Sequence, residues 1–422
     1  MTEARAPLTN WAGNHQYTAA TPQHPRSLDE LRQVIADAGS VHVLNTRHTF
    51  SAMGDAEVLV ALDRLADAEA IQIDRATMTV NVGPAVTYAR LAVALEAEGL
   101  ALANMASLPH ISVSGAIATG THGSGDRLGN LATSVRALRL LTSGGDELEI
   151  TAEDPHFPGA VVHLGALGIV TQVTLAIEPS YQLRQDVYLG MAWETLAENL
   201  DAITSAGRSV SVFHNFGEEA REVWVKRDPS AEPAPGRELF GAVAATTPRN
   251  PVLGADPINC TPQLGEPGPW HERLPHFRAG FVPSAGDEIQ SEWFVAREDG
   301  MAALRALREL AHLIQPILYV SEMRTIAADE LWASPHYRRD SIAVHFTWHL
   351  EPAAVAAACV EVERTLAPFS PRRHWGKAFG ASGATVTDSV PRLDDFLKLR
   401  DELDPSGKFV NPWFREKLLS TP

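Results

Sequence analysis

The run of small and hydroxylated residues from Ser107 to Gly125, SLPHISVSGAIATGTHGSG, constrains the fold of this 422-residue chain more than any other feature. Its glycines let backbone N–H groups approach a ligand closely, and its hydroxyls add donors. The turn Thr119–Gly123 therefore suits a pyrophosphate. The run lacks the Gly-x-Gly-x-x-Gly fingerprint and the Lys-Ser/Thr of a P-loop, which argues against a nicotinamide dehydrogenase. The plain alternative is a glycine-rich hairpin that binds nothing.

Short strands and helices are mixed along the chain. A capping box at Ser27 opens a predicted helix that Gly39 ends, and alternating strands follow over 58–83 and 135–178. Further strands are expected at 208–216, 221–227, 288–296, 317–324 and 341–350, with helices at 298–314 and 353–366. This pattern predicts an α+β protein whose second half is a sheet backed by helices.

Ten of the 28 prolines lie between Pro229 and Pro275. Proline fixes φ and removes a donor, so this stretch is predicted to be an irregular loop. Its aromatic neighbours indicate an ordered loop, which either covers an active site or packs on the surface.

Composition excludes several classes of function. With 52 acidic and 35 basic side chains, the net charge of −17 opposes binding to nucleic acid and to anionic membranes. Two cysteines, Cys260 and Cys359, exclude a disulfide framework and a thiolate metal cluster. The first residues do not resemble a signal peptide, and no apolar run approaches the ~18 residues of a membrane span. We therefore expect a cytoplasmic protein.

Two strands carry polar residues on one face. In AVHFTWHL, His345, Thr347 and His349 alternate with apolar residues, and in VSEMRT Glu322 and Arg324 share a face. Such a face is either solvated or a hydrogen-bonding floor for a polyhydroxylated ligand. No metal site is expected, because His345 and His349 would lie roughly 13 Å apart on a strand.

Two short motifs complete the set. NTRHTFS places His48 just after a strand, and HWGK contains Lys377. Alone, these are an ordinary turn histidine and a surface lysine. Beside a redox ring, a lysine can stabilise developing negative charge.

Taken in order, these segments resemble the vanillyl-alcohol-oxidase type of FAD flavoprotein, and within it the sugar-alcohol (alditol) oxidases. The resemblance runs from NWAGN at Asn10 through HTF, NMASLPHISVSGAIATGTHGSG, LGALGIVT, NCTPQLGEPGPWHERLPHFRAGF, HFTW and HWGK to DPSGKF. It implies an FAD-binding domain in two parts, 1–178 and 376–422, with an α+β substrate domain over 179–375 that carries a helix-backed antiparallel sheet. It also implies a monomer.

The resemblance further implies an activity. The terminal hydroxyl of alditols such as xylitol, sorbitol or glycerol would be oxidised to the aldose by hydride transfer to flavin N5, with O2 reduced to H2O2. One alternative is a sugar-lactone oxidase or aldonolactone dehydrogenase of the same architecture. Another is a non-catalytic flavoprotein or polyol-binding module, against which the cations expected at the flavin argue.

The resemblance assigns the site residues. His48 would be bonded through its imidazole to the flavin 8α-methyl carbon. The other FAD contacts would be Asn45, Thr46, Arg47, Thr49, Phe50, Ser107, Ser112, Gly115, Thr119, Gly120, Thr121, His122, Gly123, Gly168, Val170, His374 and Asn411. The substrate shell would be Ser107, Glu322, Arg324, His345, Thr347 and Lys377, with Arg324 and Lys377 stabilising negative charge and Glu322 orienting Arg324.

The chain departs from the family pattern before His48. The family usually has Gly-Ser-Gly there, and this chain has Asn45-Thr46-Arg47. Glycines serve turns of positive φ, which arginine adopts less readily. Arg47 is also an alternative cation for the FAD phosphates or the flavin edge.

Overall fold

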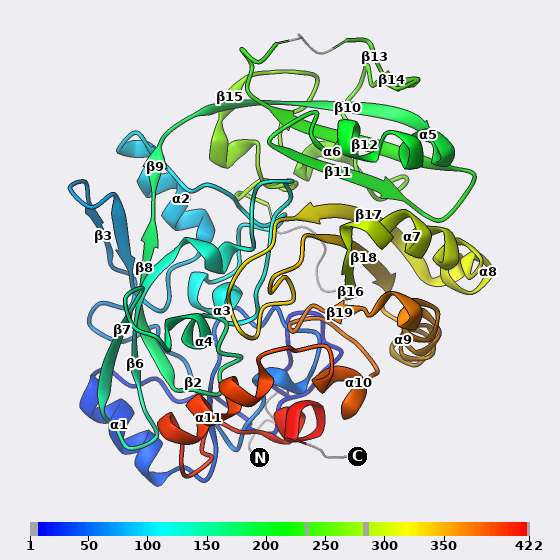
Figure 1. Ribbon diagram of the computed structural model, residues 1–422. Coiled ribbons are helices and arrows are strands. Elements are labelled where there is room, and N and C mark those ends of the chain that lie inside the picture. The colour runs from blue at the N-terminus through cyan, green and yellow to red at the C-terminus, as the bar shows by residue number, and fades with distance from the viewer. Residues whose placement is uncertain (1–6, 233–235, 282–286, 420–422) are drawn as a thin grey trace, which may run out of the picture.

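The computed structural model describes residues 7–232, 236–281 and 287–419, in which two large β-sheets lie side by side (Figure 1). The prediction that the chain does not begin with a signal peptide rests in part on residues 1–6, which lie outside these ranges. Among the described helices, none is both long enough and apolar enough to cross a bilayer.

The first sheet has five antiparallel strands in the order β3-β4-β8-β6-β7. Their bounds are β3 Ile71–Asp74, β4 Thr79–Val82, β8 Ile169–Ala176, β6 Val135–Leu141 and β7 Glu147–Thr151. A short parallel pair, β1 (Val41–Val43) and β2 (Val58–Val60), precedes it. The helices of this part are α1 (Leu28–Asp37), α2 (Tyr88–Ala97), α3 (Val113–Ala118) and α4 (Phe157–Val161). As the capping box predicts, the Ser27 hydroxyl accepts the Glu30 N–H at the start of α1.

The second sheet is antiparallel and has ten strands in the order β13-β14-β10-β12-β11-β17-β18-β16-β19, with β15 paired to β10. Their bounds are β10 Gln182–Ala192, β11 Ser209–His214, β12 Glu219–Arg227, β13 Glu238–Leu239, β14 Ala242–Ala244, β15 Gly268–Pro269, β16 Glu288–Ala296, β17 Leu318–Ile326, β18 Ser341–His349 and β19 Arg372–Arg373. The two-residue strand pair β5 (Leu100–Ala101) and β9 (Glu178–Pro179) lies at the link between the sheets.

Helices cover one face of the second sheet (Figure 1). They are α5 (Trp193–Glu198), α6 (Leu200–Thr204), α7 (Gly300–Arg308), α8 (Ala311–Ile314) and α9 (Pro352–Leu366). Val344, Phe346 and Trp348 of β18 pack in the same buried cluster as residues of α7 and α9. Strand alternation therefore turns the polar residues of β18 to the opposite face, as the sequence predicts.

The end of the chain returns to the first sheet. It contains α10 (Ala384–Thr387), α11 (Leu393–Leu403), α12 (Pro412–Phe414) and a π-helical turn at Arg415–Leu419. Phe396, Leu399 and Trp413 join the core cluster that contains Val135 and Leu138 of β6. The predicted α+β fold with a helix-backed antiparallel sheet is confirmed. The domain boundaries at 178/179 and 375/376 stay a prediction.

Candidate active site

A cavity of about 590 Å³ lies against the polar face of the second sheet. Segments 42–54, 106–122 and 163–170 of the first part line it together with strands β16, β17 and β18. Most sequence-predicted residues are in its wall, namely Asn45, Thr46, Arg47, His48, Thr49, Phe50, Ser107, Ser112, Gly115, Thr119, Thr121, His122, Gly168, Val170, Glu322, Arg324, His345, Thr347, His374 and Lys377. The structure thus brings together residues up to about 330 positions apart in the chain.

Within the described residues, three of the predicted FAD contacts do not line this cavity: Gly120, Gly123 and Asn411. Gly123 packs closely, since a Cβ there would lie 2.4 Å from the carbonyl oxygen of Met105. The Asn411 amide donates to the carbonyls of Ala52, Met53 and Asp55. Their predicted contact with FAD remains untested.

His48 lies in the wall with its ring stacked on Trp11, at a centroid distance of 5.1 Å. Its Nδ1 is buried and forms no hydrogen bond within the described structure. Burial lowers the pKa of His48 to about 4, which leaves a neutral imidazole with a free lone pair. A nucleophilic nitrogen is therefore available at the predicted attachment point.

Arg47, which stands where the family usually has glycine, adopts a left-handed backbone conformation with φ of 60°. Such a backbone costs a non-glycine residue about 1–2 kcal/mol. The carbonyl of Arg47 accepts the Trp11 N–H at 2.8 Å, and its guanidinium donates to the Thr9 carbonyl at 3.0 Å. These contacts hold the turn, and they direct Nη1 to the backbone at Thr9.

A carboxylate that the sequence analysis did not identify lies at the centre of the site. Glu292 of β16 is fully buried and accepts hydrogen bonds from Arg324 Nη2 at 3.0 Å and from Lys377 Nζ at 2.7 Å. Burial alone would raise the pKa of Glu292, but Lys377, His122 and Arg324 together hold it well below its usual range. Glu292 thus fixes two cations at the cavity wall.

Glu322 and Arg324 form the second half of this cluster. Nε of Arg324 lies 3.5 Å from Oε1 of Glu322, and Nη1 donates to the Ser107 hydroxyl at 3.2 Å. Burial opposes ionisation of Glu322, yet Arg324 and His276 lower its pKa well below the usual value. Both carboxylates are therefore ionised and paired.

The proline-rich loop contributes to the wall. Asn250, Asp256 and Asn259 line the cavity, as does His276 just after the loop. Nε2 of His276 lies 2.8 Å from Oε1 of Glu322. The sequence analysis did not identify His276, because an irregular segment has no periodicity that places a side chain on a face.

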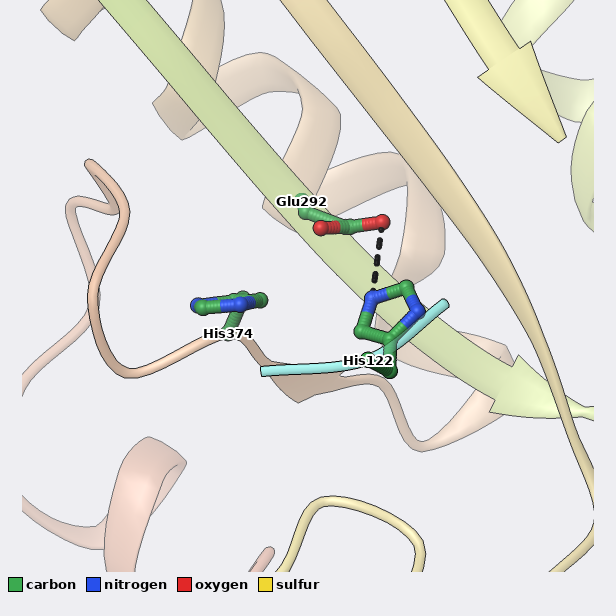
Figure 2. Close-up of side chains that lie close together, drawn as sticks. All are labelled: His122, Glu292 and His374. Carbon is green, nitrogen blue, oxygen red and sulfur yellow. Dashed lines mark ion pairs between the residues drawn. The ribbon is translucent and has the colours of Figure 1, made fainter. Parts of the chain in front are cut away.

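Figure 2 shows His122 and His374 beside Glu292, a trio close enough to hold a metal ion. Nε2 of His122 lies 3.2 Å from Oε1 of Glu292. Nδ1 of His374 accepts the Gly376 N–H at 3.1 Å, so a neutral ring has its proton on Nε2 and no free lone pair. Glu292 already pairs with Arg324 and Lys377, and these two positive charges would repel a metal ion bound to the same carboxylate. We interpret the trio as part of an ion-pair cluster.

The donor set fits a flavin dinucleotide. The wall combines Gly115, Gly165 and Gly168 with the hydroxyls of Ser112, Thr119 and Thr121 and an apolar surface that includes Val170. Gly168, with φ of 154°, approaches the Leu141 carbonyl so closely that a Cβ would lie 2.6 Å from its oxygen. Glycines and hydroxyl donors in one cavity wall are the groups that allow a phosphorylated ligand to approach the backbone closely.

Comparisons with known proteins agree with this geometry. Residues 21–151 match the FAD binding domain family, and residues 287–417 match the D-arabinono-1,4-lactone oxidase family. The chain is 44% identical to an alditol oxidase from Streptomyces sp. (strain IKD472 / FERM P-14339), over 97% of this chain and 99% of the relative. It is 28% identical to an L-gulono-1,4-lactone dehydrogenase from Mycobacterium tuberculosis, over 97% of this chain and 98% of the relative.

The fold has a solved counterpart. The crystal structure of cholesterol oxidase from Brevibacterium sterolicum superposes with a TM-score of 0.77 at 14% identity, covering 98% of this chain and 96% of that one. Fold, cavity and family matches define an FAD-dependent oxidoreductase of the vanillyl-alcohol-oxidase type. Within this class, the chain belongs to the alditol oxidase family.

Proposed function

We propose that the protein oxidises the terminal hydroxyl of alditols such as xylitol, sorbitol or glycerol to the aldose. The observation that carries this proposal is the polar floor, on which two ionised carboxylates and two cations lie beside His345, Thr347 and Ser107. Alternating donors and acceptors match a chain of hydroxyl groups, each of which donates and accepts. The higher identity to the alditol oxidase favours this substrate class over sugar lactones.

We propose the following division of roles. When bound, FAD would supply the hydride acceptor, with oxygen as the final electron acceptor that is reduced to hydrogen peroxide. Arg324 and Lys377 stabilise negative charge as the substrate hydroxyl loses its proton. Glu322 accepts a hydrogen bond from a substrate hydroxyl, and Ser107, His345 and Thr347 orient the remaining hydroxyls. As the sequence predicts, we also propose a monomeric, cytoplasmic enzyme.

Anaerobic mixing with xylitol tests the substrate. We expect the absorbance of the oxidised flavin to bleach, and air to restore it with formation of hydrogen peroxide. L-gulono-1,4-lactone is the control, because it is uncharged like xylitol but presents fewer hydroxyl groups to the polar floor. Bleaching by the lactone with no response to xylitol or sorbitol would overturn the proposal.

We further propose that FAD is covalently attached through His48. Acid precipitation should leave the yellow colour in the protein pellet, and His48→Ala should move it to the supernatant, because that variant lacks the free imidazole nitrogen. His110→Ala is the matched control: His110 interacts electrostatically with His48, but its own ring contacts the Ala279 carbonyl. A yellow supernatant from the unmodified protein would contradict covalent attachment.

A further inference from the structure

Lys226, in strand β12, is buried on the sheet face that also carries Glu322, with 1% of its surface exposed. Its Nζ donates to the carbonyls of Leu274 and Pro275 and lies 2.9 Å from Nδ1 of His276. Among the described residues, none of its hydrogen-bond partners is a carboxylate. A buried ammonium group without a directly bonded anion is costly, which indicates that its position serves a purpose beyond packing.

The three donors of the lysine determine the protonation of His276. Two N–H groups go to carbonyl oxygens, so the third points to Nδ1 of His276, which must accept with its lone pair. Burial lowers the pKa of His276 to about 4, so the ring is neutral and its one proton is on Nε2. That nitrogen is the one that lies 2.8 Å from Oε1 of Glu322.

The surroundings of Lys226 support this arrangement of charge. Glu322 attracts the ammonium group, Arg324 repels it, and the Cys260 thiol nearby is neutral because burial raises its pKa to about 12. Burial lowers the pKa of Lys226 to about 7, and His276 gives up its proton more easily still. Lysine rather than histidine therefore carries the positive charge of the pair.

The same segment also holds Ser107. The backbone N–H groups of His276 and Phe277 donate to the Ser107 carbonyl, at 3.1 and 3.3 Å. The Ser107 hydroxyl accepts from Arg324. Lys226 thus anchors segment 274–277 through the carbonyls of Leu274 and Pro275. The backbone of this segment binds Ser107, and its His276 side chain contacts Glu322.

We propose that Lys226 is a positioning residue that fixes His276 in its Nε2–H form and thereby orients Glu322 toward the substrate. Oε1 of Glu322 then faces His276 and Arg324, while Oε2, 4.0 Å from Nδ1 of His345, is left for a substrate hydroxyl. Without Lys226, His276 can take the other tautomer, which turns a lone pair toward the carboxylate and displaces it. The choice of substrate rests on the proposed function, but the tautomer does not.

Nitrogen NMR tests the tautomer directly. In the flavin-loaded protein with 15N-labelled histidine at pH 6, His276 should show a protonated Nε2 and an unprotonated Nδ1, its signals being assigned by their loss in His276→Gln. In Lys226→Met the Nδ1–H form should appear. An Nδ1–H tautomer or an imidazolium in the unmodified protein would overturn the proposal, whatever the substrate proves to be.

A double-mutant cycle tests the consequence for binding. Lys226→Met should raise the Kd for xylitol in anaerobic flavin reduction about tenfold, the loss of roughly one hydrogen bond to a charged group. Glutamine at 276 donates without a tautomer, so Lys226→Met in the His276→Gln background should change Kd by less than about twofold. An equal loss in both backgrounds would show a merely structural lysine and overturn the proposal.

Controls separate positioning from folding. Lys417 is another buried lysine, and it donates to the Ala381 carbonyl outside the cavity wall. Lys417→Met should leave the Kd for xylitol unchanged. If Lys226→Met fails to accumulate, Lys226→Gln, which keeps two donors, replaces it in the same cycle. If xylitol does not bleach the unmodified protein, the proposed function fails while the NMR experiment still decides the role of Lys226.

Discussion

Replacing Arg324 with alanine is expected to slow anaerobic flavin reduction by at least about a thousandfold. The guanidinium is buried and contacts Glu292, Glu322 and the Ser107 hydroxyl. Burial would lower the pKa of Arg324, but Glu322 and Glu292 raise it, so the side chain is a permanent cation. We propose that it lies where the substrate hydroxyl loses its proton. Stopped-flow absorbance with saturating xylitol measures this step without oxygen.

Two variants sharpen this experiment. Arg324→Lys keeps the charge but loses the fork that spans two carboxylates, so it should recover only part of the rate. Lys377→Ala should also slow reduction by orders of magnitude, because it removes the second cation on Glu292. An unchanged reduction rate in Arg324→Ala would remove this residue from the proposed mechanism.

Replacing Glu292 with glutamine should affect both stability and activity. The variant keeps the shape but leaves two buried cations without their common anion, a change that typically costs about 3–5 kcal/mol. We expect a lower unfolding temperature together with slower flavin reduction, because Arg324 and Lys377 lose their fixed positions. Calorimetry and stopped-flow reduction measure the two effects on the same preparation.

Glu288→Gln provides the control for Glu292. Glu288 lies on the same strand and also lines the cavity, but it is only partly buried. Its replacement should leave the unfolding temperature within about a degree, since a charge that remains partly open to solvent contributes little to stability. If Glu292→Gln is as stable and as fast as the unmodified protein, Glu292 is not the anchor of the two cations.

The sequence predicted the site residues that lie on strands β17 and β18. Alternation in β17 and β18 placed Glu322, Arg324, His345 and Thr347 on one face, and the cavity contains all four. The alternation of polar and apolar residues did not show where along β18 the polar floor of the cavity ends. His349 has the same parity but does not line the cavity; its ring stacks on that of Tyr319, a residue of the cavity wall, with ring centroids 4.0 Å apart.

Two residues escaped the sequence analysis for different physical reasons. The signal for Glu292 was present, since Glu288, Gln290 and Glu292 alternate with Ile289 and Trp293 along EIQSEWFVA. The sequence analysis predicted this segment only as a strand and did not consider which face its polar residues occupy. His276 had no such signal, because its position depends on bonds from Lys226 and to Ser107, residues 50 and 169 positions earlier.

The way both ends of the chain share the cavity bears on the order in which a ribosome can build this protein. The Phe50 N–H donates to the Gly376 carbonyl at 2.9 Å, and the Asn411 amide binds three carbonyls between Ala52 and Asp55. More than 300 further residues must therefore be synthesised after the segment around His48 before its partners Gly376 and Asn411 leave the ribosome. Capture of the cofactor is expected to be a late, post-translational event, and a nascent chain arrested before residue 370 should remain colourless.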